Sequence, residues 1–156
     1  DKQFIRKEPS ISLMTNDQQN ENTRLGPDDI SLFRDKNLVF VATLMADGSP
    51  QITPTWVDID EKNGHIIINT AKGRVKQRNV TRDPRIAVAV VDRNNPYNVA
   101  TIRGRVIEQT TEGADSNADS LAKKYLGVEK YPYRNPSEER VLLKIKPEKI
   151  FRIKPQ

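Results

Sequence analysis

Residues 70–83 read TAKGRVKQRNVTRD, and the rest of the chain can be placed around this stretch. The segment before it, HIIIN at 65–69, is typical of a β-strand. Pro84 follows it and sets its end, because proline disfavours helix in the preceding residue. Between these limits the pattern predicts one short helix that begins just after Gly73.

The first turn of this predicted helix is unusually basic. Lys72, Arg74 and Lys76 crowd the end where unpaired N–H groups and the helix dipole already create positive potential. Such crowding is unfavourable unless an anion binds there, and a helix N-terminus readily binds phosphate. Arg74 and Lys76 are therefore the predicted phosphate ligands. The alternative is a basic, solvated surface helix, which is how Arg78 and Arg82 are best interpreted.

Composition narrows the possible functions. The 156 residues suit one domain with a proper core. The formal net charge of +5 favours an anionic ligand or a nucleic acid only slightly. The absence of cysteine excludes disulfides and thiolate metal sites, and the single histidine, His65, argues against a His-rich metal site or a Ser-His-Asp triad. No apolar stretch approaches the roughly 20 residues of a membrane span, so we expect a soluble, cytoplasmic protein.

The chain divides into a polar extension, residues 1–24, and one domain, residues 25–156. Pro27 and the acids after it start a short helix that is predicted to stop near Asn37. The apolar run at 38–45 predicts a strand buried on both faces.

A second strand is predicted to run without a break through the alternating residues 51–59. It contains Pro54, which has no N–H for a ladder and belongs at an edge, a bulge or a place where the sheet opens.

Four further segments complete the predicted domain. Residues 85–91 form a buried strand, and a long strand runs from Tyr97 to about Gln109 with a bulge or bend at Gly104. Residues 114–126 form a helix packed on the core. Two closing strands, 140–146 and 149–153, are predicted to be separated at Pro147. The sum is a mainly β (α+β) domain, a small barrel of six or seven mostly antiparallel strands with flanking helices.

Two motifs connect this order of elements to a known family. They are PQITPTW at 50–56 and RVKQRN at 74–79, followed by the strand with Gly104. The chain resembles the flavin-binding split β-barrels related to pyridoxamine 5′-phosphate oxidase. Within them it is most similar to the branch that uses the deazaflavin coenzyme F-420. The resemblance runs from about Leu25 to Ile153.

The resemblance implies a homodimer with two cofactor sites at the subunit interface. The second predicted strand would lie along the ring system of the cofactor, and the end of the next strand would lie beside it. The basic helix would bind the phosphate. The second subunit would offer Tyr97 to the ring. The matching residues are Thr53, Pro54, Thr55, Trp56, Asn69, Thr70, Arg74, Lys76, Asn79 and Tyr97. Taken alone, Trp56 could be a core residue, Thr53 and Thr55 ordinary strand residues, and Tyr97 a barrel-rim aromatic.

The function that follows is an oxidoreductase that transfers a hydride to or from a small organic substrate. The cofactor would supply the chemistry, so we name no catalytic residue and no metal ligand. An FMN-binding flavin reductase or oxidase of the same fold is the alternative. Vitamin B6 oxidation is not expected, because the C-terminus FRIKPQ lacks the Trp and Arg region of authentic pyridoxamine phosphate oxidases. A cofactor carrier or nucleic-acid-binding barrel is disfavoured, since only 6% of residues are aromatic.

Overall fold

The computed structural model describes residues 22–153. Most of the predicted extension, residues 1–21, and the last residues, 154–156, lie outside this range. At the start of the described chain, the carbonyl of Asn22 accepts a hydrogen bond from the N–H of Ile150 at 2.7 Å.

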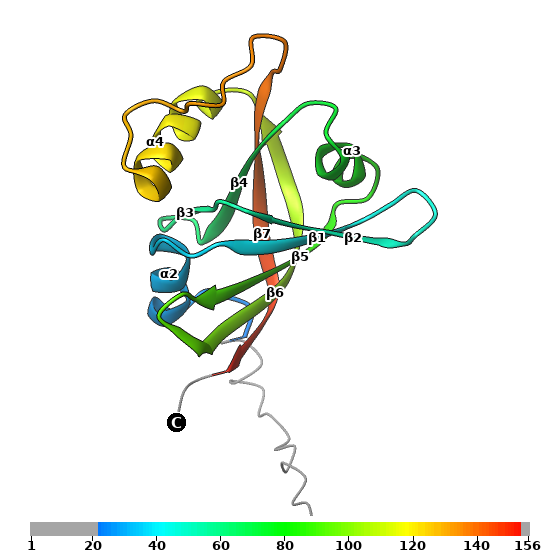
Figure 1. Ribbon diagram of the computed structural model, residues 1–156. Coiled ribbons are helices and arrows are strands. Elements are labelled where there is room, and N and C mark those ends of the chain that lie inside the picture. The colour runs from blue at the N-terminus through cyan, green and yellow to red at the C-terminus, as the bar shows by residue number, and fades with distance from the viewer. Residues whose placement is uncertain (1–21, 154–156) are drawn as a thin grey trace, which may run out of the picture.

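Seven antiparallel strands form one curled sheet (Figure 1). Their order is β2-β1-β5-β6-β7-β4-β3. The consecutive strands β2 and β3 occupy the two edges of this sheet and do not pair with each other. The curled sheet therefore does not close into a full barrel. This confirms the predicted mainly β split barrel. The strands are β1 (Val39–Leu44), β2 (Pro50–Thr55), β3 (Asp58–Asp60), β4 (His65–Ala71), β5 (Arg85–Asp92), β6 (Asn95–Thr110) and β7 (Arg140–Ile153).

The predicted continuous strand 51–59 is wrong. The chain leaves β2 after Thr55, crosses the opening of the barrel through Trp56 and Val57, and joins the far edge as β3. Val57 is fully buried, and its N–H donates to the hydroxyl of Tyr125 at 3.1 Å instead of to a strand. In the sequence the break coincides with a shift of the apolar positions, from Ile52, Pro54 and Trp56 before it to Val57 and Ile59 after it. Pro54 lies on an edge strand, as predicted.

The core lies inside the curl of the sheet. Its fully buried members include Phe33, Val41, Ile68, Ile102 and Leu143. The prediction that β1 is buried on both faces is wrong, because burial alternates along it and Phe40 is 41% exposed. Only one face of β1 packs into the core of a single chain, which leaves an apolar outward face.

Three helices lie outside the sheet within the described residues: α2 (Pro27–Arg34), α3 (Val75–Arg82) and α4 (Ala114–Leu126). None of them is long and apolar enough to cross a membrane. Helix α2 ends at Arg34, before the predicted stop at Asn37. Asn37 is instead a buried link, since its Nδ2 donates to the Leu32 carbonyl at 2.9 Å and its Oδ1 accepts from the Arg93 N–H at 2.9 Å.

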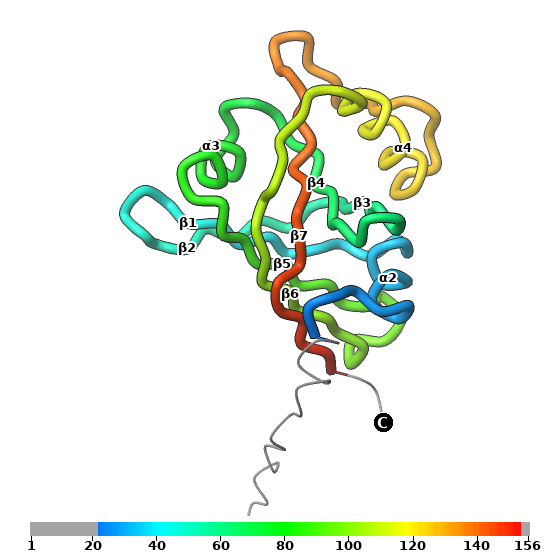
Figure 2. Tube along the Cα trace, turned by 180° about the vertical axis from the view of Figure 1, so that it is seen from behind, coloured from blue at the N-terminus to red at the C-terminus, as the bar shows by residue number. Residues whose placement is uncertain are grey.

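The long strands β6 and β7 run side by side along the molecule (Figure 2). The predicted break at Pro147 is wrong, because β7 is continuous. Pro147 lies opposite Gly104, where the register shifts, so the regular ladder is already interrupted and no proline N–H is required. The bulge at Gly104 is confirmed. A Cβ at Gly104 would lie 2.3 Å from the carbonyl oxygen of Lys146, which explains the glycine.

Candidate functional site

A pocket of about 300 Å³ is lined by residues of α3, α4 and the paired ends of β4 and β7. Figure 1 shows the two helices on either side of these strand ends. The walls of the pocket come from β2 and the crossing after it, the end of β4, the start of α3, one side of α4, and the segment 131–140. Seven of the ten predicted site residues line it. They are Pro54, Thr55, Trp56, Asn69, Thr70, Arg74 and Lys76.

The other three predicted residues lie outside this pocket. Thr53 is half-buried in the edge strand β2. Asn79 is 3% exposed and uses its amide to hold α3 on the sheet, with Nδ2 donating to the hydroxyl of Thr43 at 3.0 Å and Oδ1 accepting from Arg82 at 2.8 Å. Tyr97 is 72% exposed at the start of β6. Its predicted role concerns a second subunit and stays a prediction.

The start of α3 has the features of an anion site. Arg74 is the N-cap, no side chain caps the helix, and its first turn has no acid. Gly73 makes the tight entry with φ of +86°, and its N–H donates to Gln77 Oε1 at 2.9 Å. The helix N-terminus therefore keeps its positive potential directed at the pocket residues Arg74 and Lys76.

Lys76 is a half-buried cation that makes no ion pair with the residues the structure describes. Burial lowers the pKa of its amine, and the nearby cations Arg74 and Arg140 lower it further. Arg74, in contrast, has a partner, since its Nη2 lies 2.9 and 3.0 Å from the two carboxylate oxygens of Glu138. Three cations thus line this pocket, and Glu138, which pairs with Arg74, is not one of the lining residues.

Arg140 is the third cation, and its side chain is only 10% exposed. Its Nε donates to Asn69 Oδ1 at 2.9 Å, and its guanidinium lies 5.3 Å from the ring centroid of Tyr131. Its Nη1 is buried without a hydrogen-bond partner in the described part of the chain, and so is the hydroxyl of Thr70 in the same pocket. Buried polar groups normally have partners. The orphaned groups therefore fit a ligand that supplies hydrogen-bonding atoms, an anion in the case of Arg140.

Aromatic rings form the other wall. Trp56 stacks on Tyr125, with centroids 5.3 Å apart and planes 4° apart. Tyr131 meets Trp56 edge-on at 6.1 Å, and Tyr133 meets Tyr131 edge-on at 5.7 Å. Because Trp56 lines the pocket and Tyr125 does not, Tyr125 backs the indole from outside.

Polar contacts behind this stack hold the crossing in place. The Tyr125 hydroxyl accepts from the Val57 N–H at 3.1 Å and donates to the Asn37 carbonyl at 2.6 Å. Burial raises the pKa of Tyr125 to about 12, so the phenol stays neutral. The Lys124 amine donates to the Val57 carbonyl at 2.8 Å. These contacts fix the position of the neighbouring Trp56.

Sequence reasoning missed Tyr131, Tyr133 and Arg140. The two tyrosines stand in an irregular segment without periodicity, and Arg140 is the first residue of a strand. The nearest signal was the repeated aromatic in Tyr131-Pro132-Tyr133. Within residues 22–153, no group of three or more His, Cys, Asp and Glu side chains is placed to hold a metal ion.

The family model described as pyridoxamine 5′-phosphate oxidase matches residues 30–154, which confirms the resemblance. A solved structure described as an F-420 reductase has a TM-score of 0.68 at 26% identity, and the match covers 78% of this chain and 94% of that one. No curated protein matches the chain.

Two other solved structures are similar at lower TM-score. HupZ from Group A Streptococcus has a TM-score of 0.59 at 26% identity, over 81% of this chain and 98% of that one. HutZ from Vibrio cholerae, described as a heme storage protein, has a TM-score of 0.59 at 14% identity, over 83% of this chain and 94% of that one. At that identity the likeness to HutZ concerns the fold alone.

Proposed function

The chain belongs to the pyridoxamine 5′-phosphate oxidase family, and we propose that it is an oxidoreductase that binds the deazaflavin coenzyme F-420 between α3 and α4. It would transfer a hydride to or from a small organic substrate. The likeness to an F-420 reductase supports this choice of cofactor. When bound, the deazaflavin would supply the hydride chemistry, and the protein would supply binding and orientation.

Lys76, which has no ion-pair partner among the described residues, carries the proposal. A half-buried amine beside Arg74 and Arg140 is destabilising by itself, as the lowered pKa of Lys76 reflects. A phosphate at the uncapped start of α3 would offset the repulsion and accept hydrogen bonds from the amine and the helix N–H groups. The cofactor phosphate is therefore assigned to Lys76, Arg74 and the first turn of α3.

The ring system is assigned to the side of the pocket formed by Pro54, Thr55 and Trp56. Pro54 and Thr55 end the edge strand β2, and Trp56 follows it; the outer side of β2 has no paired strand in the described chain. A flat ring could therefore meet free backbone groups there. A volume of about 300 Å³ is at the small end for ligand pockets, so it suits the ring and phosphate end rather than the whole coenzyme.

A second copy of the chain would complete the site. Residues in register across an antiparallel sheet share a face, and one such row crosses five strands. Its members are Pro54, Phe40, Ala89, Thr101 and Phe151. Phe40 is 41% and Phe151 61% exposed, although both are large and apolar. We assign this outward face to a homodimer interface that borders the pocket at Pro54 and brings in Tyr97 of the partner subunit.

The dimer has its own test. Light scattering of the purified chain should give twice the chain mass, and Phe40→Asp should halve it while the protein stays folded by circular dichroism. A monomeric wild type at micromolar concentration would contradict the assignment.

FMN is the second candidate cofactor, because it presents a phosphate at the same end of a similar ring. Heme binding, suggested by the fold of HutZ, finds less support. Heme iron needs an axial His, Cys, Met or Tyr. Of these residue types the pocket lining contains only the tyrosines Tyr131 and Tyr133, and His65, the only histidine, lies outside it at the start of β4.

The experiment is a fluorescence titration, with Trp56, the only tryptophan, as the reporter. The purified chain is titrated separately with F-420 and with FMN. Lys76→Ala tests the phosphate site, and Lys123→Ala, an exposed lysine on α4, is the matched control. We expect saturable quenching by F-420 at far lower concentration than by FMN, weakened only in Lys76→Ala.

Two outcomes would change the conclusion. Tighter binding of FMN would assign the protein to the flavin-dependent members of the family. Quenching by neither ligand, with calorimetry also showing no binding, would reject the cofactor assignment.

A further inference from the structure

Arg140 is held in place unusually well for a pocket cation. It is the first residue of β7 and lies in register with Ala71, the last residue of β4. Its Nε donates to Asn69 Oδ1 at 2.9 Å. Asn69 is itself fixed from α4, because its Nδ2 donates to the Ala114 carbonyl at 2.8 Å and to Asn117 Oδ1 at 3.0 Å. The guanidinium is therefore set in one orientation before any ligand arrives.

The hydrogen-bonding capacity of Arg140 is not used up by these contacts. A guanidinium has five N–H donors, and Nη1 is buried without an acceptor. The nearest carboxylate, Glu138 Oε2, lies 3.7 Å from Nη1, beyond hydrogen-bond distance. Glu138 instead makes its close contacts with Arg74, at 2.9 and 3.0 Å. A nine-tenths buried, unpartnered donor in a pocket wall is expensive to keep unless a ligand satisfies it.

The surroundings of this donor define the rest of the ligand. The guanidinium lies 5.3 Å from the ring of Tyr131, which stands edge-on to Trp56. Tyr133, 65% exposed, extends the aromatic wall to the pocket mouth. A flat, conjugated molecule fits against these rings, with its anionic end on Arg140.

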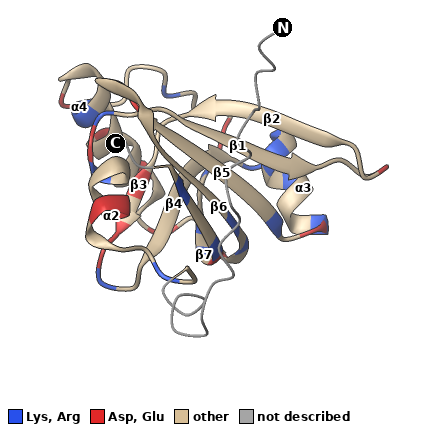
Figure 3. Ribbon diagram, turned by 90° about the horizontal axis from the view of Figure 1, so that it is seen from below, with Lys and Arg blue, Asp and Glu red and all other residues tan. Residues whose placement is uncertain are grey.

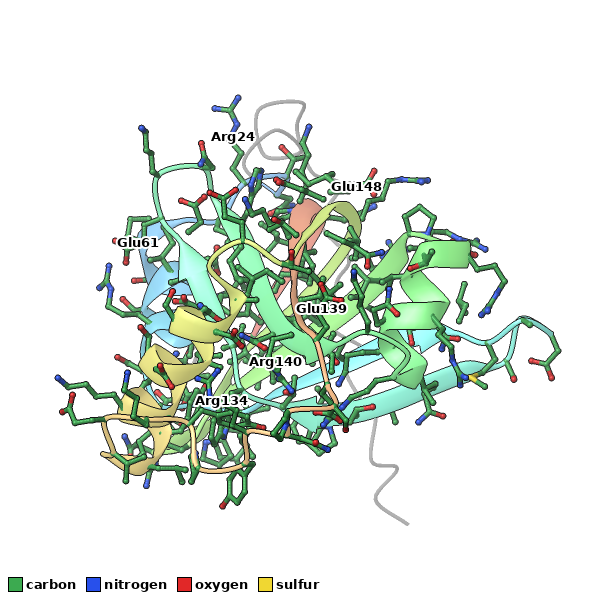
Figure 4. All side chains as sticks on the ribbon, turned by 90° about the horizontal axis from the view of Figure 1, so that it is seen from above. Arg24, Glu61, Arg134, Glu139, Arg140 and Glu148 are labelled. Carbon is green, nitrogen blue, oxygen red and sulfur yellow. The ribbon has the colours of Figure 1, made fainter. Side chains whose placement is uncertain are left out.

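We infer that Arg140 binds the carboxylate of a planar, conjugated substrate that lies against Tyr131 and Tyr133. Figure 4 shows Arg140 between α4 and α3. This places it on the β7 side of the pocket, whereas the cofactor phosphate is assigned to the start of α3. The substrate class rests on the proposed function for its reaction, but the binding of a planar carboxylate can be tested without the cofactor.

The test compares an acid with its amide. The probes are trans-cinnamate and trans-cinnamamide, which have the same flat skeleton but differ in charge. Binding is followed by NMR on the labelled chain, through the indole N–H signal of Trp56, which is assigned because the chain has one tryptophan. We expect the acid to bind about tenfold more tightly than the amide, as a charge-assisted contact implies.

Two variants locate the effect. Arg140→Gln should bring the acid down to the affinity of the amide and leave the amide unchanged. Arg134→Gln is the matched control. Arg134 lies in the segment beside α4, where it pairs with Asp115 and Asp119 of that helix, and its replacement should alter neither affinity. If Arg140→Gln does not fold, Arg140→Lys keeps the charge but loses the fork of donors, and the acid preference should then fall about threefold.

Several results would overturn the inference. Equal affinity of wild type for acid and amide would do so before any variant is made. Retention of the preference in the Arg140 variant would do so as well. Loss of F-420 or FMN affinity in Arg140→Gln as large as in Lys76→Ala would assign Arg140 to the cofactor phosphate instead. If wild type binds neither cofactor but prefers the acid, the proposed function fails and the role of Arg140 stands.

Discussion

Replacing Lys76 with methionine is expected to stabilise the free protein and to weaken its binding of a phosphate ligand. Methionine has a similar length and a good helix propensity, so α3 should form as before. The change removes a half-buried cation that has no carboxylate partner among residues 22–153 and that lies near Arg74 and Arg140. A residue kept for folding alone would show the opposite effect on stability.

The two magnitudes follow from the surroundings of the amine. Relief of the charge repulsion should raise the free energy of unfolding by about 0.5–1 kcal/mol, or Tm by roughly 1–4 °C for a chain of this size. Loss of one charge-assisted hydrogen bond to phosphate, about 1.5–3 kcal/mol, should weaken F-420 or FMN binding by about 10- to 150-fold.

The pH dependence has a definite sign. Because burial and the neighbouring cations lower the pKa of Lys76 in the folded state, the unfolded chain binds the proton more tightly. The wild type is therefore penalised below its folded pKa and recovers stability as pH rises toward the unfolded value of about 10.4. The stability advantage of Lys76→Met should shrink over that window.

Thermal melts at several pH values and cofactor titrations on the same samples measure all three effects. Lys123→Met, an exposed substitution on α4, is the control and should change neither quantity. A variant less stable than wild type at pH 7, or one with unchanged cofactor affinity, would refute the reasoning that Lys76 is reserved for an anion.

Three further outcomes are expected. Tyr125→Phe should lower the free energy of unfolding by about 2–4 kcal/mol in urea titrations, because the buried N–H of Val57 and the carbonyl of Asn37 lose their partner. Gly104→Ala should lower it by about 1–3 kcal/mol or more, because the new Cβ would meet backbone at 2.3 Å. Burial lowers the pKa of Lys124 to about 8, so wild-type stability relative to Lys124→Gln should rise with pH from about 8 to about 10.

Much of the fold was predictable because single residues restrict the backbone at their own positions. The start of α2 at Pro27, the end of α4 before Gly127 and the bulge at Gly104 each depend on what one residue permits its own backbone to do. The break after β2 was missed because the only local sign of it is a one-residue shift of the apolar positions, from Ile52, Pro54 and Trp56 to Val57 and Ile59, within an otherwise strand-like run. In a curled sheet, the partner strand decides where a strand ends. Here β2 pairs with β1, whereas β3 pairs with β4.

The candidate site likewise has a part that the sequence predicts and a part that it does not. The basic turn of α3 was predictable because Arg74 and Lys76 conflict with the helix dipole next to them in sequence. Tyr131 and Arg140 carry no such local conflict. The place of Arg140 in the pocket results from the pairing of β7 with β4 and from the hydrogen bond to Asn69, 71 positions earlier in the chain. Tyr131 is held from α4, because its N–H donates to Asp119 Oδ1 at 2.8 Å.

The arrangement of charge argues for a small anionic ligand over a polyanion. Basic α3 and acidic α2 lie apart in Figure 3, and many surface cations have carboxylate partners, as Arg34 has Glu61. A net charge of +5 spread in this way gives little long-range attraction for nucleic acid. The pocket lining, as far as the described residues form it, contains three cations and no carboxylate beside an aromatic wall. A concave site of about 300 Å³ can enclose a flat ring and its phosphate, whereas the backbone of a nucleic acid needs an open basic track.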